Sequence, residues 1–178
     1  MDKTIEDIMT RRSVRSFEKR PVSRADLETI TEAALSAPSA SGRKPWHVAV
    51  IEDAKTRKSV ATAMEWFKPV ADAPVALLVC GEPGKSFQGD YWLVDCAALC
   101  ENALLAARAL GLGSVWCGIS PIEGNVERIR SVLDIPANLV PFAMIAIGYP
   151  EKTDAFRERN RSGDDARLSW NPDWLKKY

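Results

Sequence analysis

Apolar positions recur along this chain with two different periods, and the change of period separates the expected helices from the expected strands. Apolar residues three or four positions apart predict helices over 4–12, 23–37, 53–67, 90–110 and 126–133. Short continuous apolar runs predict strands over 46–51, 74–80, 114–117 and 140–147. Because these elements alternate without regular βαβ units, we expect an α+β fold with a central mixed or antiparallel sheet flanked by helices.

The first helix is expected to start at Thr4, three residues before Asp7, since this spacing resembles a capping box. Ile5, Ile8 and Met9 then form its apolar stripe. After this helix, residues 13–17 are expected to be extended.

The helix over 90–110 is the longest and is apolar nearly all round, and Gly111 is its expected C-terminal stop. Its strongly polar residues are Asp95, Glu101, Asn102 and Arg108. Such a helix must be buried on most faces. A second copy of the chain would cover the surface that one small domain leaves open, which predicts a homodimer. The ionisable residues interrupt a stretch barely long enough to cross a membrane, so a membrane span is not expected.

Composition narrows the function classes. The 178 residues suggest one domain over 1–178, with a polar C-terminal extension over 151–178. Lys plus Arg and Asp plus Glu are equal at 24 each, which argues against general nucleic-acid binding. The four cysteines stand in apolar runs and the single histidine cannot supply a His-based zinc site, so we expect no metal. The N-terminus does not resemble a signal peptide, and a reducing cytoplasm fits best.

Two arginine-rich segments are candidates for binding an anion. In an extended segment, residues two apart face the same side, so Arg11, Ser13 and Arg15 would present two guanidinium groups with a hydroxyl between them. Arg159 and Arg161 repeat the spacing near the C-terminus. The alternative is two solvated charge runs, and either R-x-R alone favours that alternative.

Two loops could bring backbone amides close to a flat ligand: the small-residue run from Pro38 to Pro45, and the turn from Pro121 to Gly124. Ordinary surface turns are the alternative for both. The sequence from Gly111 to Trp116 begins like a dinucleotide fingerprint, but Trp116 replaces the third glycine and the run precedes a strand, which excludes that motif. No G-x-S-x-G motif is present, so a hydrolytic nucleophile is not expected either.

Four segments in this order resemble the FMN-dependent nitroreductase family: RRSVR, APSASGRKPWHVAVI, GLGSVWCG and VPFAMIAIGYP. The resemblance runs from about Thr4 to Trp170. It implies a nitroreductase-like fold and a homodimer that shares its active sites and binds FMN. It further implies that NAD(P)H reduces nitroaromatics, quinones or other electron-poor small molecules by ping-pong hydride transfer, with the cofactor rather than a catalytic side chain carrying the chemistry.

The resemblance also implies which residues bind the cofactor. The residues implied to bind the phosphate and the pyrimidine edge of the flavin are Arg11, Arg12, Ser13 and Arg15. A basic pair near the C-terminus, Arg159 and Arg161, is implied to bind the phosphate as well. The loop against the isoalloxazine, contributed by the other subunit, comprises Pro38, Ser39, Ala40 and Ser41, with Lys44 at its end. The turn whose backbone amide addresses the flavin N5 comprises Pro121, Ile122, Glu123 and Gly124.

One departure from the family pattern concerns the loop: many relatives have Asn-x-Gln where this chain has Gly42, Arg43 and Lys44. Two other functions stay open from the sequence. One is a relative with a different reaction (flavin reductase, enoate reductase, dehalogenase or flavin-fragmenting enzyme), and the other is a non-enzymatic flavin redox sensor. The polar extension over 151–178 is expected to pack on the partner subunit.

Overall fold

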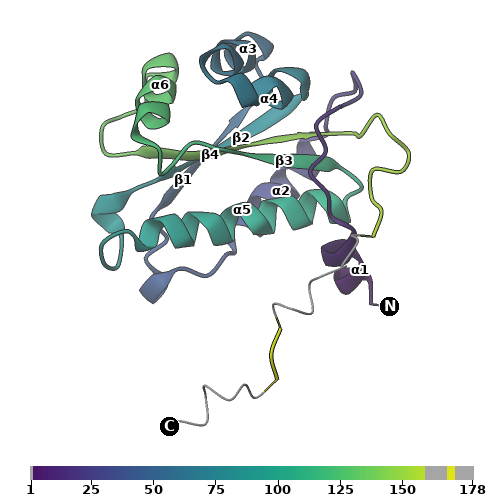
Figure 1. Ribbon diagram of the computed structural model, residues 1–178, viewed down its shortest axis with the longest axis horizontal. Helices are drawn as coiled ribbons and strands as arrows, with labels where there is room; N and C mark the ends of the chain where they lie inside the picture. Colours follow the sequence, from purple (N-terminus) through teal and green to yellow (C-terminus); the bar gives the residue numbers. More distant parts are fainter. Residues whose placement is uncertain (1, 159–167, 171–178) are drawn as a thin grey trace.

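A four-stranded sheet forms the centre of the computed structural model, which describes residues 2–158 and 168–170 (Figure 1). Its strands lie in the order β1-β2-β4-β3, and each neighbouring pair is antiparallel. Their bounds are β1 (Trp46–Ile51), β2 (Val75–Gly81), β3 (Gly113–Gly118) and β4 (Val140–Gly148). The predicted α+β fold with an antiparallel sheet is therefore confirmed.

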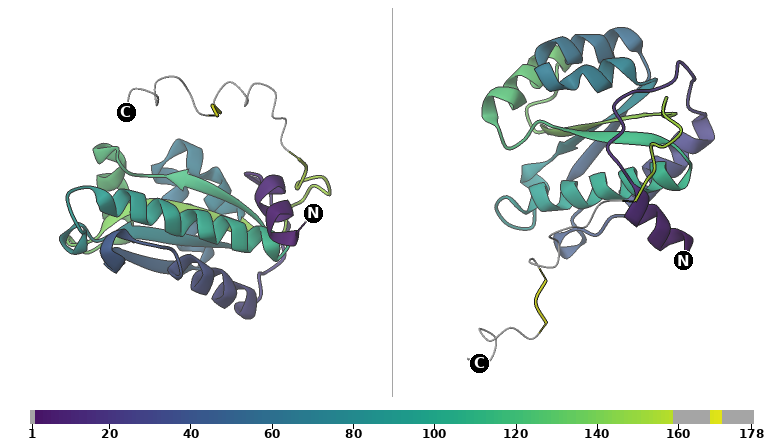
Figure 2. Two further views of the ribbon diagram at one scale, coloured as in Figure 1. Left: turned by 90° about the horizontal axis from the view of Figure 1, so that it is seen from below. Right: turned by 45° about the vertical axis from the view of Figure 1, so that its right-hand side comes forward.

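Helices cover both faces of this sheet, as the turned views in Figure 2 also show. In Figure 1, α3 (Ala54–Ala63), α4 (Lys68–Asp72) and α6 (Glu123–Leu133) lie above it, and α2 (Arg24–Leu35) and α5 (Tyr91–Ala109) lie below. Side chains of β2 and β4 alternate between the two layers, so that Leu77 and Ile145 pack on the α5 side while Ala76 and Met144 pack on the α3 side. Coverage on both faces explains why these two strands read as continuous apolar runs.

The first helix, α1 (Lys3–Thr10), differs from the prediction in its start and in its orientation. The cap is Asp2, whose carboxylate accepts a hydrogen bond from the Thr4 amide at 2.9 Å, so the predicted cap at Thr4 is wrong. Ile5 and Ile8 are 47% and 49% exposed, whereas Asp7 and Thr10 are buried. The helix thus turns its polar side toward the body of the protein, because Asp7 and Thr10 both find a partner on α5.

The single helix predicted over 53–67 is also wrong. α3 ends at Ala63, and Met64 takes an extended conformation before the short helices η2 (Glu65–Phe67) and α4. Met64 is 1% exposed and Phe67 is fully buried, and the break in the helix allows both side chains to enter the core.

α5 matches its predicted range closely, and Gly111 follows it with a φ of +75°. One side of the helix is fully buried, but Tyr91 and Val94 on another side are 50% and 65% exposed. No helix among the described residues is both long enough and apolar enough to span a membrane.

All four cysteines are free and buried, as expected for core thiols. Burial raises the pKa of Cys80 and Cys117 to about 11 and that of Cys96 to about 12.

Candidate cofactor-binding site

The chain that follows α1 runs across the start of the edge strand β3 and then past the end of β4. The Val14 amide donates to the Ser114 carbonyl at 2.9 Å, and Ser13 and Ser114 form a parallel bridge. Further along, the Glu18 amide donates to the Tyr149 carbonyl at 2.9 Å, and Phe17 and Pro150 form an antiparallel bridge. The extended conformation predicted for 13–17 agrees with these contacts.

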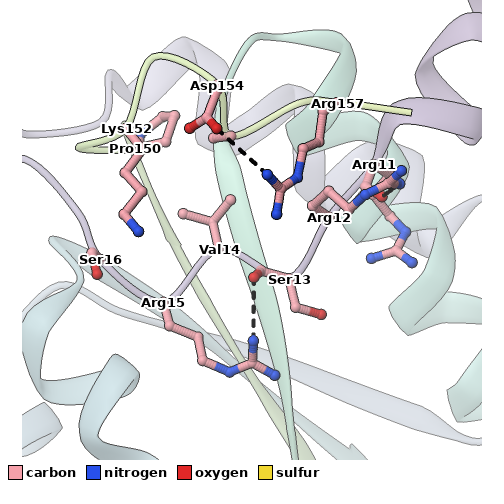
Figure 3. A pocket seen from close by; sticks show the side chains of 11 residues that line it. Arg11, Arg12, Ser13, Val14, Arg15, Ser16, Pro150, Lys152, Asp154 and Arg157 are labelled. Atoms are coloured by element: carbon pink, nitrogen blue, oxygen red, sulfur yellow. Dashed lines mark hydrogen bonds and ion pairs between the residues drawn. The ribbon is translucent and has the colours of Figure 1, made fainter. Parts of the chain in front are cut away.

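These contacts create a pocket of about 650 Å³ between two chain segments (Figure 3). One wall is the chain segment that comes directly after α1, and the other is the segment that comes directly after β4. The pocket is lined by Arg11, Arg12, Ser13, Val14, Arg15 and Ser16 on the first wall and Pro150, Lys152, Asp154, Ala155 and Arg157 on the second. Five lining side chains are cationic and one is acidic, so an anion is the ligand that this pocket favours.

The cations of the pocket differ in how they are held. Arg12 donates to the backbone carbonyls of Met9 at 3.1 Å and Arg11 at 2.6 Å, so its guanidinium group folds back over the end of α1. Arg15 is exposed and donates to the Ser13 carbonyl at 3.3 Å. Arg157 is exposed as well and lies 3.6 Å from the Asp154 carboxylate. The exposed guanidinium groups can therefore turn toward a ligand at little cost in lost contacts.

This arrangement fits a phosphate group. A phosphate dianion is best bound by several guanidinium groups that approach it from different directions, and the two walls supply them.

Lys152 and Arg157 on the second wall were not among the predicted site residues. A signal was present, because Arg157 stands two positions before Arg159 and extends the same R-x-R spacing. The predicted residues Arg159 and Arg161 lie outside the described part of the chain, so their contribution stays a prediction.

The predicted loop from Pro38 to Ser41 lies elsewhere. It forms the short helix η1 (Ala40–Gly42), and the Ala40 amide donates to the buried Asp95 carboxylate at 2.9 Å. In Figure 1 this loop lies under the N-terminal half of α5, at the lower left, whereas α1 lies at the right. Asp95 and Arg108, which contacts α1, are separated by about 20 Å along the helix at 1.5 Å per residue.

The backbone of this loop is unusual. Ser41, Gly42 and Lys44 have φ values of 51°, 66° and 49°, a left-handed region that costs energy for residues other than glycine. The Ser39 hydroxyl accepts a hydrogen bond from the Lys44 amide at 2.9 Å and closes the turn. The departure from the Asn-x-Gln pattern thus coincides with a tightly wound turn.

The third predicted segment, from Pro121 to Gly124, leads from β3 into α6. The peptide bond before Pro121 is cis, Ile122 is 59% exposed, and Glu123 is the first residue of the helix. None of the four residues lines the pocket between the two walls. A single chain therefore brings Arg11, Arg12, Ser13 and Arg15 together and leaves the other two predicted segments outside this pocket.

Comparison with known proteins identifies the family. Residues 8–86 and 68–149 match the model of the nitroreductase family. A protein of Archaeoglobus fulgidus named as an NADH dehydrogenase/NAD(P)H nitroreductase is 40% identical over 174 residues, which cover 97% of this chain and 96% of the relative. This chain belongs to the nitroreductase family.

Solved structures of other nitroreductases have the same fold. An NADH dehydrogenase/NAD(P)H nitroreductase from Bacteroides thetaiotaomicron has a TM-score of 0.88 at 32% identity, with 96% of this chain and 98% of that chain covered. A nitroreductase from Desulfovibrio desulfuricans, solved in complex with FMN, has a TM-score of 0.81 at 27% identity, with 97% and 98% covered. The resemblance inferred from the four sequence segments is thereby confirmed.

Proposed function

We propose that this nitroreductase-family protein binds FMN and uses NAD(P)H to reduce nitroaromatic compounds, quinones or similar electron-poor acceptors. The observation that carries the proposal is the cationic pocket built from Arg11, Arg12, Arg15, Lys152 and Arg157 in a chain of this family. The names of the relatives confirm the oxidoreductase class and the pairing of FMN with NAD(P)H that the sequence predicts.

The pocket would bind the phosphate end of FMN. Arg11 and Arg157 would approach it from opposite walls, and the Ser13 hydroxyl would add a neutral hydrogen-bonding group. Arg15, on the same wall as Arg11, would lie beside the pyrimidine edge of the flavin. Bound FMN supplies the hydride chemistry, for which the lining of this pocket offers no redox-active side chain. The protein's part is to bind the cofactor, to orient it and to set the charge around it.

A homodimer with shared sites would bring the remaining predicted segments to the cofactor. The loop from Pro38 to Ser41 lies at the other end of α5 from α1, and in our proposal it reaches the isoalloxazine of the partner's FMN. The exposed apolar side chains of Ile5 and Ile8 on α1 and of Val94 on α5 support the proposal, since a second copy would remove them from water.

The reaction would follow a ping-pong scheme in which NAD(P)H and the acceptor occupy one apolar slot in turn. The turn from Pro121 to Gly124 would hold a backbone amide toward the flavin N5, and Arg159 and Arg161 would add to the phosphate contacts. Because the slot would be formed by both subunits, each acceptor would be bound by residues of two chains.

The visible spectrum of the purified protein tests the proposal most directly. We expect yellow protein that releases FMN and not FAD on denaturation, and that loses its colour with NADH or NADPH under anaerobic conditions. Steady-state assays with a nitroaromatic, a quinone and free FMN then identify the acceptor class. Colourless protein that FMN cannot reconstitute would refute the proposal, whereas protein that holds FMN but is not bleached by NAD(P)H would favour a redox sensor.

Mixing two defective chains tests the shared site. One chain carries Arg11→Ala and Arg15→Ala, and the other carries Ser39→Trp, a large side chain in the loop opposite the ring. If each site draws on both chains, the heterodimer recovers about one intact site of its two, as the two-fold arrangement requires. A fully active FMN-loaded monomer at micromolar concentration would rule the shared site out.

A further inference from the structure

Arg108, near the C-terminal end of α5, lies where three separate parts of the chain meet. Its side chain is 12% exposed, and its guanidinium NH1 lies 3.2 Å from the Asp7 carboxylate. Its Nε donates a hydrogen bond to the Thr10 hydroxyl at 3.0 Å. The face of the same guanidinium group stacks on Phe156, 4.4 Å from the ring centroid.

Two of the three partners of Arg108, Thr10 and Phe156, directly precede cationic residues of the pocket. Asp7 and Thr10 belong to the last turns of α1, and the next residues are Arg11 and Arg12 on the first wall. Phe156 is followed at once by Arg157 on the second wall. Neither Arg108 nor its three partners line the pocket, so Arg108 contacts residues that are adjacent in sequence to both walls.

We propose that Arg108 is a positioning residue that holds the two walls of the pocket at the separation required to bind the cofactor phosphate. The inference rests on the proposed function, because it assigns a role to Arg108 only if the pocket binds that phosphate. A single side chain would then connect the orientation of α1 with that of the loop after β4.

The chemistry of the group explains why an arginine stands here. The guanidinium fork donates to two acceptors in one plane and leaves its face free to stack on an aromatic ring. Lysine would keep the attraction to Asp7, but it is a point charge without that planar face.

The contacts of each wall support this assignment. Asp7 is 8% exposed at its side chain, and its second cationic partner, Lys3, is 63% exposed, so Arg108 is the buried charge that compensates it. On the other wall, backbone contacts to Phe17 and Glu18 hold the start of the loop near Tyr149 and Pro150. Phe156 anchors its later half by packing on buried core residues and on Arg108.

Binding of FMN and of riboflavin, which lacks the phosphate, provides the test. Both dissociation constants are measured from flavin fluorescence on apoprotein, together with the melting temperature of each apoprotein. The variants are Arg108→Met, which removes all three contacts, Thr10→Val, which removes one contact of the first wall, and Phe156→Leu, which removes the stacking on the second. Arg128→Met on α6, an exposed arginine on the far side of the sheet, is the matched control.

We expect Arg108→Met to raise the dissociation constant of FMN about 10- to 100-fold, the equivalent of one lost charge-assisted contact, and to change that of riboflavin less than about threefold. Thr10→Val and Phe156→Leu should each raise the dissociation constant of FMN by about three- to tenfold. Both should again change the dissociation constant of riboflavin much less. Arg108→Lys should recover part of the loss, and Arg128→Met should behave as the wild type.

The outcomes separate the inference from the proposed function. If the wild type binds FMN no better than riboflavin, the proposed phosphate pocket is wrong. If the wild type prefers FMN and Arg11→Ala abolishes the preference while Arg108→Met, Thr10→Val and Phe156→Leu retain it, only the role of Arg108 is wrong. Equal weakening of FMN and riboflavin by all three variants would show a purely structural role and would overturn the inference. Should Arg108→Met fail to fold, the other two variants decide.

Discussion

Gly113 at the start of β3 is the position where a single added carbon should affect the candidate site most selectively. A Cβ at this position would lie 2.7 Å from both Cβ and Cγ1 of Val14 and 2.9 Å from its Cγ2. Ordinary van der Waals contact begins at 3.4 Å, so Gly113→Ala must push the segment carrying Val14 away from β3 by about 0.7 Å. The backbone conformation of Gly113 is itself open to alanine, so the contact is the whole perturbation.

The cost follows from what Val14 does. It is 9% exposed, its amide bonds to Ser114, and it stands between Ser13 and Arg15 on the first wall of the pocket. Overpacking of this kind costs about 1–3 kcal/mol. For a chain of this size the melting temperature should fall by about 2–4 °C for each kcal/mol, or about 2–12 °C in total. Because Arg15 moves with the segment, the affinity for FMN should also fall by about tenfold, the equivalent of about 1.4 kcal/mol.

Thermal denaturation of the apoprotein and flavin fluorescence titration measure the two effects. Gly84→Ala is the matched control, because a Cβ at Gly84 would meet nothing within 4 Å and its φ is not positive. If Gly113→Ala melts and binds FMN like Gly84→Ala, then the segment over 13–17 does not pack on β3 as described, and the first wall of the pocket is wrong.

Three further predictions concern individual groups. Arg157→Ala should raise the dissociation constant of FMN by about tenfold or more and leave riboflavin nearly unchanged, because one charge-assisted contact contributes about 1.5–3 kcal/mol; equal losses in titrations of both ligands would contradict this. Arg15→Ala should lower the midpoint potential of bound FMN by about 30–60 mV, since a nearby cation favours the electron-rich form and 1.4 kcal/mol corresponds to 30 mV for two electrons; an unchanged potential in a spectroelectrochemical titration would place Arg15 elsewhere. Burial raises the pKa of Cys80 and Cys117 from 9.0 to about 11, so above about pH 9 the unfolded chain releases thiol protons that the folded chain retains, and the free energy of unfolding should decrease up to about pH 11. Urea denaturation at several pH values checks the slope, which should be shallower in a Cys80→Ala/Cys117→Ala variant.

The elements that sequence patterns predict best are those whose environment is uniform. β2 and β4 are buried on both faces, so their runs of apolar residues identify them directly. α1 could not be oriented in this way. Its apolar stripe suggests that Ile5 and Ile8 face the core, but the side that packs carries Asp7, whose partner Arg108 lies about 100 positions away in the chain. A long-range ion pair of this kind leaves no periodic signal.

The residues of the candidate site also differ in how far the sequence alone predicts them. Arg11, Arg12 and Arg15 stand so close in sequence that their joint role could be anticipated, and the structure brings them into one pocket. Lys152 and Arg157 look like solvated loop charges until the pairing of residues 16–18 with the chain after β4 sets them opposite the first wall. The role proposed for the loop from Pro38 to Ser41 involves a second chain, so it would rest on contacts between chains and not on contacts within one.

The two bridges that build the pocket also determine when it can form during synthesis. Ser13 pairs with Ser114 and Phe17 pairs with Pro150, partners that lie about 100 and 130 positions later in the chain. At about 5–20 residues per second, the ribosome needs about 7–27 seconds after making Phe17 to deliver its partner. Until then the basic segment has no opposite wall, and contacts of such high sequence separation form late in folding. Because β4 lies between β2 and β3 and ends at Gly148, the nascent chain completes its sheet and gains the second wall of the pocket almost together. A nascent protein stalled before Pro150 would carry the arginines of the first wall without the pocket.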